Sequence, residues 1–212
     1  MDILKIFEEA GVVPVIKLTD PAQALPLAEA LRKGGLNCAE ITFRTDAAAE
    51  SIRRIHEAFP DMALAAGTVL TPEQVNAAAE AGAAAIVSPG LNPTVVQYCL
   101  DRGIPVCPGV CTPGEVEKGL SFGLNLLKFF PAEVSGGVPM VKALSAPYGN
   151  VRFMPTGGVK PANLRDYISQ KAVFCCGGTW LAPQDLIDVG DFEKITENGK
   201  EAVAIVKEVR GK

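Results

Sequence analysis

The sequence predicts an α/β fold, a (β/α)8 barrel formed by residues 1–212 as a single domain, and three observations support this. The chain of 212 residues is 48% hydrophobic and 21% charged, which provides ample aliphatic material for a core. Short aliphatic runs recur with starts 20 to 26 residues apart, and a helical pattern fills each gap. Eight such units fit the TIM barrel, whose lower size limit is about 200 residues.

Eight short runs of aliphatic and β-branched residues are the expected strands. They begin at Val12 (VVPVIKL), Cys38 (CAEITF), Ala63 (ALAAGTV), Ala84 (AAIVSPG), Ile104 (IPVCPGV), Asn125 (NLLKFF), Val151 (VRFMPTGG) and Ala172 (AVFCCGG). Because eight strands and their helices must fit into a chain near the lower size limit of the barrel, the connecting loops are expected to be short.

Helical patterns fill the gaps, and capping residues support several of them. The clearest patterns begin at Pro21, Thr71, Asn92 and Lys160, and Gly34, Gly82 and Gly103 stand at the far ends of the first three. Asp20 precedes Pro21, which is typical of a helix start. Thr71 precedes a proline and has Gln74 three positions later, which is the spacing of a capping box.

The two ends of the chain are predicted to complete the barrel. The segment DILKIFEEAG forms an extra N-terminal helix that plugs the barrel bottom, and residues 191–210 close the outer ring of helices. The competing layout is an open doubly wound sheet, which needs a glycine fingerprint after the first strand. That position reads IKLTDPAQA, so the barrel is favoured.

The charge balance and the start of the chain argue against nucleic acid and membrane partners. Lys plus Arg is 20 and Asp plus Glu is 24, a net charge of -4, and no run is rich in Lys or Arg. The N-terminus lacks the basic-then-apolar layout of a secretory signal. No apolar stretch approaches the roughly 18–20 residues of a membrane span. We therefore expect a cytoplasmic protein.

Histidine and cysteine usage excludes other chemistries. The single histidine, His56, rules out a Ser-His-Asp triad and a multi-histidine zinc site, and it is most simply a surface residue of a helix. Neither Cys107 with Cys111 nor the adjacent Cys175 and Cys176 has the C-x-x-C spacing of a zinc site. We expect packing thiols, with one of the adjacent pair facing into the barrel, and neither a metal nor a cofactor.

A lysine lies in the expected sixth strand, NLLKFF. Side chains alternate along a strand, so Lys128 shares one face with Leu126 and Phe130, while Leu127 and Phe129 share the other. Because the outer face meets apolar helices, Lys128 must point into the barrel. Burial among Leu and Phe disfavours the charged form and frees a nucleophilic amine. The alternative is a structural lysine paired with a carboxylate; we favour the catalytic role, since lysines are seldom buried without a partner or a task.

The same alternation applies to the second strand, where Glu40, Thr42 and Arg44 share one face. A carboxylate and a guanidinium are thus expected in the same interior as Lys128. An ion pair between Glu40 and Arg44 at the rim is an equally good explanation of these two residues alone. Together with Lys128, however, they form a set suited to Schiff-base chemistry on a 2-oxo acid, with an amine nucleophile, a proton shuttle and an anion-binding arginine.

Glycine pairs follow the last two strands, in PTGGVKPAN (residues 155–163) and CCGGTWLAP (residues 175–183). Barrel enzymes commonly hold a phosphate there with backbone N–H groups and a helix N-terminus. Two pairs at neighbouring strands favour phosphate binding over turn formation, and Thr179 could add a hydroxyl. After the third strand, Gly67 allows a close backbone approach and Thr68 offers a hydroxyl, although a turn and a cap explain them equally well.

These motifs resemble a known family. VVPVI, EITFRT, AGTVL, IVSPG, PGVCTP, LKFFPAE, PTGG and GGTWL are similar, in order and spacing, to the class I 2-dehydro-3-deoxy-6-phosphogluconate (KDPG) and 4-hydroxy-2-oxoglutarate (KHG) aldolases. The similarity runs from about Gly11 to Asp191, and LKFFPAE and EITFRT are its most specific parts.

The resemblance implies a role for each matching residue. Lys128 forms the Schiff base, Glu40 shuttles protons, and Arg44 and Thr68 hold the pyruvate carboxylate. The implied pocket walls are Pro89 and Phe130, and the implied phosphate site contains Thr156, Gly157, Gly158, Gly178 and Thr179. The family usually has Ser in place of Thr179, which keeps the hydroxyl but adds a methyl group and stiffens χ1. A homotrimer is also implied.

The expected reaction is the reversible aldol cleavage of a phosphorylated 2-oxo-3-deoxy sugar acid to pyruvate and glyceraldehyde 3-phosphate, without a metal. Two alternatives stay open. The first is a sister aldolase acting on 4-hydroxy-2-oxoglutarate or on the galactonate-derived epimer. The second is a non-catalytic barrel that binds a phosphate ligand and uses Lys128 only as an anion contact. An isomerase of the phosphoribosyl type fits less well, because it would not need a buried amine.

Overall fold

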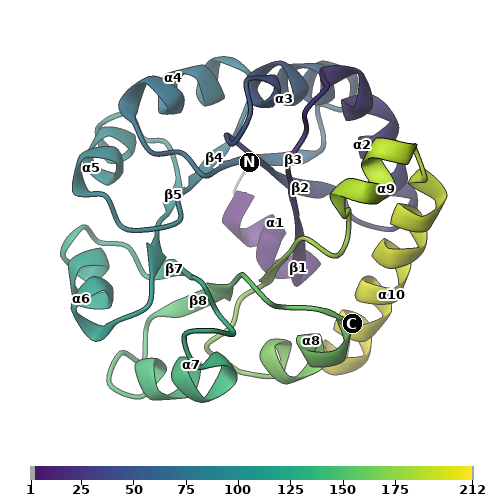
Figure 1. Cartoon of the computed structure of the whole chain (residues 1–212). Coiled ribbons are helices and arrows are strands. Elements are labelled where there is room, and N and C mark those ends of the chain that lie inside the picture. The colour runs from purple at the N-terminus through teal and green to yellow at the C-terminus, as the bar shows by residue number, and fades with distance from the viewer. Residues whose placement is uncertain (1–2, 212) are drawn as a thin grey trace.

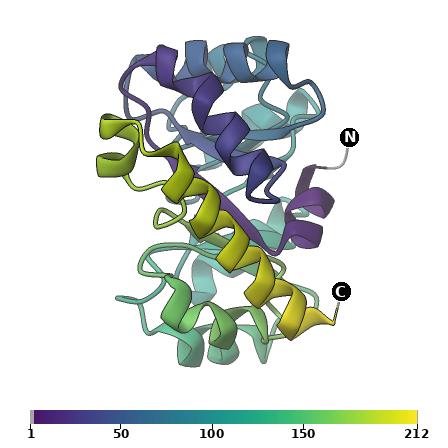
Figure 2. The ribbon, with the colours of Figure 1, turned by 90° about the vertical axis from the view of Figure 1, so that its right-hand side faces the viewer.

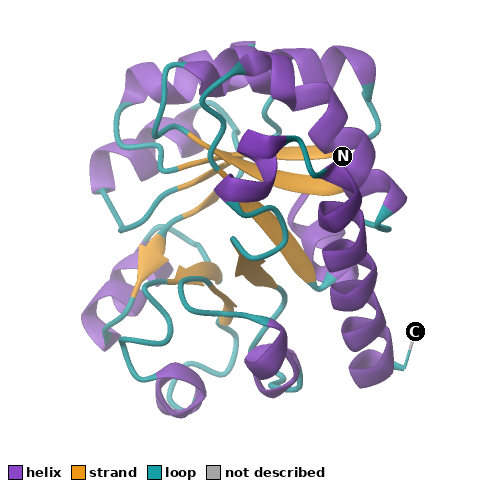
Figure 3. Ribbon diagram, turned by 45° about the vertical axis from the view of Figure 1, so that its right-hand side comes forward, coloured by secondary structure: helices purple, strands orange, loops and turns teal. Residues whose placement is uncertain are grey.

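The computed structural model describes residues 3–211 and has the predicted (β/α)8 architecture. Figure 1 shows a ring of helices around the strands, with the N-terminal helix α1 (Ile3–Ala10) at its centre. Figure 3 shows the same arrangement by element type, with the strands inside and the helices outside. Among residues 3–211, no helix combines the length and the apolar character that crossing a membrane requires.

The strands pair in parallel in the order of the chain. They are β1 (Val12–Ile16), β2 (Cys38–Thr42), β3 (Ala63–Gly67), β4 (Ala85–Val87), β5 (Val106–Cys107), β6 (Gly109–Val110), β7 (Leu126–Phe129), β8 (Arg152–Pro155) and β9 (Cys176–Gly178). The first strand also pairs with the last, with Val12 opposite Cys176. All eight predicted strand positions are therefore present.

Two of the predicted strands are less regular than expected. The run from Ile104 is divided at Pro108 into β5 and β6, because proline has no N–H with which to continue a ladder. The hydrogen-bonded ladder consequently forms a six-stranded and a three-stranded sheet. The run from Ala172 is a regular strand only in β9, but isolated bridges at Phe153–Val173 and Thr156–Gly177 join it to β8 and close the ring.

The helices follow the strands on the outside. They are η1 (Pro21–Gln23), α2 (Ala24–Lys33), α3 (Ala47–Ala58), α4 (Pro72–Glu80), α5 (Pro93–Asp101), α6 (Pro113–Ser121), α7 (Gly137–Ser145), α8 (Pro161–Ile168), α9 (Gln184–Val189) and α10 (Phe192–Arg210). Helix α10 contacts α2 and α8, and Figure 2 shows it running along the outside of the barrel. The prediction that this segment closes the outer ring is confirmed, whereas the short α9 was not predicted.

The predicted caps are present, with one difference. Asp20 Oδ1 accepts a hydrogen bond from the N–H of Ala22 at 2.8 Å, and Thr71 Oγ1 accepts one from the N–H of Gln74 at 3.3 Å. The Gln74 side chain does not return to the N–H of Thr71, as a capping box requires. Its oxygen accepts from the N–H of Leu70 at 2.7 Å instead, so the contact is displaced by one residue.

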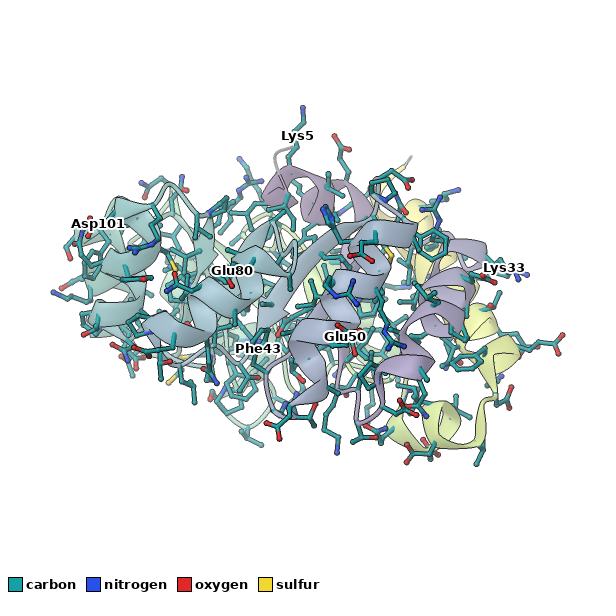
Figure 4. All side chains as sticks on the ribbon, turned by 90° about the horizontal axis from the view of Figure 1, so that it is seen from above. Lys5, Lys33, Phe43, Glu50, Glu80 and Asp101 are labelled. Carbon is teal, nitrogen blue, oxygen red and sulfur yellow. The ribbon has the colours of Figure 1, made fainter. Side chains whose placement is uncertain are left out.

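Two apolar layers hold the barrel. The inner layer lies inside the ring of strands and contains Ile3 and Phe7 of α1, so this helix is the predicted plug. The outer layer lies between strands and helices. Cys175 belongs to the inner layer and Cys176 to the outer one, as the alternation of a strand predicts. In the side view of Figure 4, Lys5 of α1 lies at one end of the barrel and Phe43, which follows β2, lies toward the other end.

Candidate active site

Lys128 lies in the middle of β7 and points into the barrel. Its neighbours Leu127 and Phe129 are fully buried in the outer layer, while Leu126 packs against the inner layer. The alternation predicted from the sequence is thus the alternation of the structure. Only 4% of Lys128 is exposed, so its amine is largely removed from bulk water. Such burial requires either a compensating charge or a bound ligand.

The compensating charge is Glu40, which is fully buried in β2. Lys128 Nζ lies 3.1 Å from Glu40 Oε1, so the two side chains meet across the barrel interior although their strands are not neighbours. The other carboxylate oxygen, Oε2, is buried and has no hydrogen-bond partner in the structure. A buried acceptor of this kind is available for a proton or for a hydroxyl group of a ligand.

Gly67, at the end of β3, makes room for Glu40. A Cβ atom at this position would lie 2.7 Å from Glu40 Cγ and would overlap its carboxylate. The close approach that the sequence predicted at this glycine is therefore an approach to the Glu40 side chain. Any larger residue would push the carboxylate away from Lys128.

The surroundings of Lys128 are mainly apolar. Its Nζ lies 5.4 Å from the centre of the Phe130 ring, within the range of a cation–π contact. Cys107 lies close enough for both Lys128 and Glu40 to influence it electrostatically, and burial raises the pKa of its thiol to about 12. The thiol is therefore uncharged at neutral pH and adds no competing anion beside the amine.

Arg44 lies at the mouth of the barrel rather than in its interior. It follows the end of β2 and is exposed, so the expectation that it shares the interior with Lys128 is wrong. The strand ends at Thr42, whose hydroxyl donates to the carbonyl of Ile16 at 2.8 Å. The rim ion pair with Glu40 is not formed, because Glu40 pairs with Lys128.

Arg44 lines a cavity of about 400 Å³ at the carboxyl ends of β1, β2 and β9. Thr179 and Lys17 line the same cavity, so two cations and a hydroxyl group surround one space. Lys17 is not among the site residues predicted from the sequence. Val13 and Val15 precede it at alternate positions, and Val13 belongs to the inner layer. The alternation argument used for Lys128 would therefore have placed Lys17 on the inward side of its strand.

Thr68 has an unusual backbone conformation at the mouth of β3. Its φ is 56°, and it is the only non-glycine residue among residues 3–211 with a positive φ. This left-handed conformation is unfavourable for a β-branched residue and is retained where the surrounding structure imposes it, often at functional sites. The residue is half-buried.

Pro89 is also half-buried. Its carbonyl packs against Gly109 of β6, which is the residue opposite Lys128 in the pairing of β6 with β7.

The two glycine pairs lie next to each other at the ends of β8 and β9. Gly157 and Gly158 both have positive φ values, 95° and 85°. Gly177 and Gly178 have no room for a side chain, because a Cβ would overlap Thr156 and the Trp180 ring respectively. These close approaches require glycine at both positions. Thr156 itself is buried and bridges β8 to β9, whereas Thr179 is exposed.

Cavity size alone does not locate this site. A larger groove, of about 520 Å³, lies between α2 and α10 on the outer surface and is lined by Glu29, Lys33, Glu193 and Lys200 among others. It contains no buried ionisable residue. We place the candidate active site at the Lys128–Glu40 pair, because these two ionisable side chains are buried away from water.

Among residues 3–211, no group of three or more His, Cys, Asp or Glu residues is placed to hold a metal ion.

Comparisons with known proteins show relatives over nearly the whole chain. The family model for the KDPG and KHG aldolases matches residues 3–198. The 2-dehydro-3-deoxy-phosphogluconate aldolase of Treponema pallidum (strain Nichols) is 46% identical over 204 residues, which cover 96% of this chain and 97% of that protein.

Two solved structures are similar over nearly their whole length. The KDPG aldolase of Legionella pneumophila, with pyruvate captured at low pH as a covalent carbinolamine intermediate, has a TM-score of 0.92 and 38% identity, covering 95% of this chain and 98% of that one. The 2-keto-3-deoxy-6-phosphogluconate aldolase of Zymomonas mobilis ZM4, with 3-phosphoglycerate, has a TM-score of 0.90 and 40% identity, covering 96% of each chain.

Proposed function

Because the chain belongs to the KDPG and KHG aldolase family, we propose that it cleaves 2-dehydro-3-deoxy-6-phosphogluconate reversibly to pyruvate and glyceraldehyde 3-phosphate through a Schiff base. The observation that carries this proposal is the buried contact of 3.1 Å between Lys128 Nζ and Glu40 Oε1. An amine beside a carboxylate, in an apolar interior, is the arrangement that Schiff-base formation and proton transfer require.

The first steps take place at Lys128. Glu40 accepts a proton from the ammonium group, and the neutral amine attacks the C2 ketone of the substrate to form a carbinolamine. Glu40 returns this proton to the carbinolamine hydroxyl, which leaves as water, so that Glu40 is again a carboxylate. The resulting iminium ion withdraws electrons from the neighbouring bonds. The short distance between Nζ and Oε1 supports this proton transfer, since both groups are within hydrogen-bond reach.

The bond-breaking step uses Glu40 again. Its carboxylate, through a water molecule, removes the proton of the C4 hydroxyl, and the C3–C4 bond breaks. The electron pair moves to the iminium, so an enamine of pyruvate remains on Lys128 and glyceraldehyde 3-phosphate leaves. Glu40 then returns a proton to C3, and hydrolysis releases pyruvate and the free lysine. The unpartnered Oε2 supports this role, because it is the acceptor left free by the ion pair.

The ends of the substrate are assigned to the mouth of the barrel. Arg44 and Thr68 hold the pyruvate carboxylate, and Pro89 and Phe130 form the walls. The phosphate binds at Thr156, Gly157, Gly158, Gly178 and Thr179. Two features support this assignment: Gly157 and Gly158 form a tight turn with positive φ, and Lys17 adds a positive charge to the cavity that Thr179 lines.

Trapping the covalent intermediate tests the proposal. The protein is incubated with pyruvate, reduced with borohydride and weighed intact, and the adduct is then located by peptide mapping. We expect one pyruvate-derived adduct per chain, on Lys128. Lys128→Met should give no adduct and no turnover, because methionine is similar in volume but has no amine.

The matched control is Lys142→Met, which removes an exposed lysine of α7 and should leave the adduct and the turnover unchanged. An unmodified wild-type protein, or an adduct on another lysine, would contradict the mechanism. Pyruvate release from a phosphorylated substrate separates an aldolase from a barrel that only binds phosphate ligands.

The family name itself favours a second candidate reaction, the cleavage of 4-hydroxy-2-oxoglutarate. A coupled pyruvate assay on 2-oxo-3-deoxy acids that differ at C4 and in phosphorylation distinguishes the two, because the glycine pairs contribute only when a phosphate is present. We expect the phosphorylated gluconate derivative to have the highest kcat/KM.

The resemblance also supports three further proposals. The protein works in the cytoplasm, in the Entner-Doudoroff pathway, and assembles as a homotrimer. Sedimentation velocity at several concentrations tests the assembly. One chain has a mass of 22.3 kDa, and we expect a species with three times this mass. A single species with the mass of one chain would contradict it.

A further inference from the structure

The segment that follows Lys128 lies beside the glycine turn after β8. The N–H of Ala132 donates to the carbonyl of Thr156 at 2.8 Å, and the N–H of Glu133 donates to the carbonyl of Gly157 at 3.0 Å. The segment directly after the strand that carries Lys128 is therefore connected by hydrogen bonds to the turn assigned to the phosphate. Glu133 is the last residue of this connection.

The Glu133 side chain lies flat against the second glycine of the turn. A Cβ atom at Gly158 would lie 2.5 Å from Glu133 Cγ and 2.6 Å from its Cβ, so only glycine fits beneath this side chain. The contact is on the turn itself rather than in the core, because Glu133 and Gly158 are both exposed. The conformation of Gly158 thus depends on where the Glu133 side chain is held.

Tyr167 of α8 holds that side chain. Its hydroxyl donates a hydrogen bond to Glu133 Oε1. Tyr167 is completely buried, and burial, followed by the Glu133 carboxylate, raises its pKa, so the phenol remains protonated and able to donate. The same helix also holds the turn directly, since Asn163 Nδ2 donates to the carbonyl of Gly158 at 3.1 Å.

The charge of Glu133 is unfavourable for its location. A carboxylate beside an anion site repels the ligand, and an uncharged residue would avoid this cost. Its presence is explained if the carboxylate makes a strong, charge-assisted hydrogen bond that positions the turn.

We propose that Glu133 and Tyr167 form a positioning pair, which holds the Gly157–Gly158 turn in the conformation that binds the phosphate of the substrate. Neither side chain contacts the substrate, so both act through the turn. This inference rests on the proposed function, because it presumes that the turn binds a phosphate.

The test compares a phosphorylated substrate with its non-phosphorylated analogue. In Tyr167→Phe, only the hydroxyl is lost, and we expect the KM for 2-dehydro-3-deoxy-6-phosphogluconate to rise about tenfold, the loss typical of a hydrogen bond to a charged group. The kcat, the kcat/KM for 2-dehydro-3-deoxygluconate and the exchange of the pyruvate methyl protons in heavy water should not change. Glu133→Ala should raise the same KM at least as much. Glu133→Gln keeps an acceptor oxygen and the packing on Gly158, so its KM should be closer to that of the wild type.

The matched control is Tyr148→Phe, which removes another tyrosine–glutamate hydrogen bond, that to Glu117 at 2.8 Å. Tyr148 precedes the start of β8, whereas the turn follows the end of this strand. The KM of Tyr148→Phe should equal that of the wild type. If Tyr167→Phe raises the KM of both substrates by the same factor, or lowers only the Tm, the pair is merely structural and the inference is overturned. If the wild type cleaves both substrates equally well, the turn is not a phosphate site, and if it releases no pyruvate at all, the proposed function itself fails.

Discussion

Glu40 and Lys128 are the two charged residues that are buried among residues 3–211, and their burial has a large desolvation cost. Their mutual contact at 3.1 Å offsets part of that cost, but Glu40 Oε2 is left without a partner. A pair of this kind contributes little net stability compared with apolar residues of similar volume. Its retention is therefore better explained by chemistry than by stability.

At the scale of this pair, Glu40→Gln separates binding from proton transfer. The amide retains the size of the side chain and can accept a hydrogen bond from Lys128, but it cannot take up a proton at neutral pH. We expect the borohydride adduct with pyruvate to persist, and the exchange of the pyruvate methyl protons to slow by about a hundredfold or more.

The exchange is followed by NMR in heavy water. Glu50→Gln, which changes a half-buried carboxylate of α3 outside the barrel interior, is the matched control and should exchange at the wild-type rate; Figure 4 shows Glu50 on its helix. Unchanged exchange in Glu40→Gln would count against the proton-transfer role of Glu40.

Gly67→Ala changes the position of Glu40 without altering its chemistry. The new methyl group would overlap the Glu40 carboxylate, so we expect kcat to fall by about a hundredfold, in line with the loss of one positioned acid–base group. The backbone of Gly67 does not have a positive φ, so far-UV circular dichroism should not change. Gly114→Ala, at a helical glycine with open space around it, should leave kcat unchanged.

Side-chain caps hold several of the helix starts, among them those of α4, α5 and α6, and the cap of α6 is a reciprocal one. Thr112 Oγ1 accepts a hydrogen bond from the N–H of Glu115 at 3.4 Å, and Glu115 Oε2 accepts from the N–H of Thr112 at 2.9 Å and from that of Cys111 at 2.8 Å. This reciprocal capping box satisfies N–H groups that the helix leaves free. The helix therefore begins at a defined residue, and the loop before it is short.

Removing the Thr112 hydroxyl should destabilise α6 and with it the protein. We expect Thr112→Ala to lower the free energy of unfolding by about 1 kcal/mol at neutral pH, the typical effect of losing an N-cap. Urea denaturation followed by circular dichroism measures this. Thr94→Ala, which changes an exposed threonine in the first turn of α5, is the control and should have a much smaller effect. Equal effects of the two variants would show that the cap is not the cause.

The same capping box predicts a pH dependence. Burial of the Glu115 carboxylate acts to raise its pKa, but hydrogen bonds from Cys111 and Thr112 outweigh this and lower the pKa below its ordinary value. Because the folded state binds the proton more weakly than the unfolded state does, the contribution of Glu115 is complete above the ordinary carboxyl pKa. It is lost as the pH falls through the lowered value. The difference in the free energy of unfolding between the wild type and Thr112→Ala should accordingly become smaller in acid.

At the scale of the whole molecule, the barrel separates stability from function along its axis. Helix α1 fills one end with Ile3 and Phe7, among small inner residues such as Ala63, Ala65 and Ala85. These alanines leave room that the large side chains of α1 occupy. The glycine pairs and the cations lie at the carboxyl ends of the strands, which is the end where barrels place their active sites.

Phe7→Ala should therefore lower stability without abolishing the chemistry. Truncating a fully buried phenylalanine leaves a cavity, and we expect the free energy of unfolding to fall by about 3–5 kcal/mol. The pyruvate adduct on Lys128 should still form at temperatures where the variant is folded. The control is Phe122→Ala, which truncates a half-buried phenylalanine directly after α6 and should lower the free energy of unfolding by less than Phe7→Ala does. Loss of the adduct in folded Phe7→Ala would contradict the separation.

The single-domain organisation stays a prediction, and unfolding tests it. The outer apolar layer runs from Val12 to Val206 and includes residues from every part of the chain between them. We expect a single cooperative transition, with coincident curves by near-UV and far-UV circular dichroism, because no part of this layer can separate from the rest without exposing apolar surface. Two separated transitions would indicate more than one folding unit.

The sequence by itself determined the barrel, the inward direction of Lys128 and Glu40, and the glycine pairs, because alternation along a strand and the spacing of strands and helices are local properties of the chain. Only the tertiary structure decided which groups meet. Glu40 and Lys128 are 88 positions apart in the sequence and meet because the sheet curves into a ring. The same ring brings Arg44 and Lys17 to one cavity at its mouth. It also brings Tyr167 onto Glu133. Contacts between distant segments depend on how the whole ring closes, and no local pattern encodes that closure.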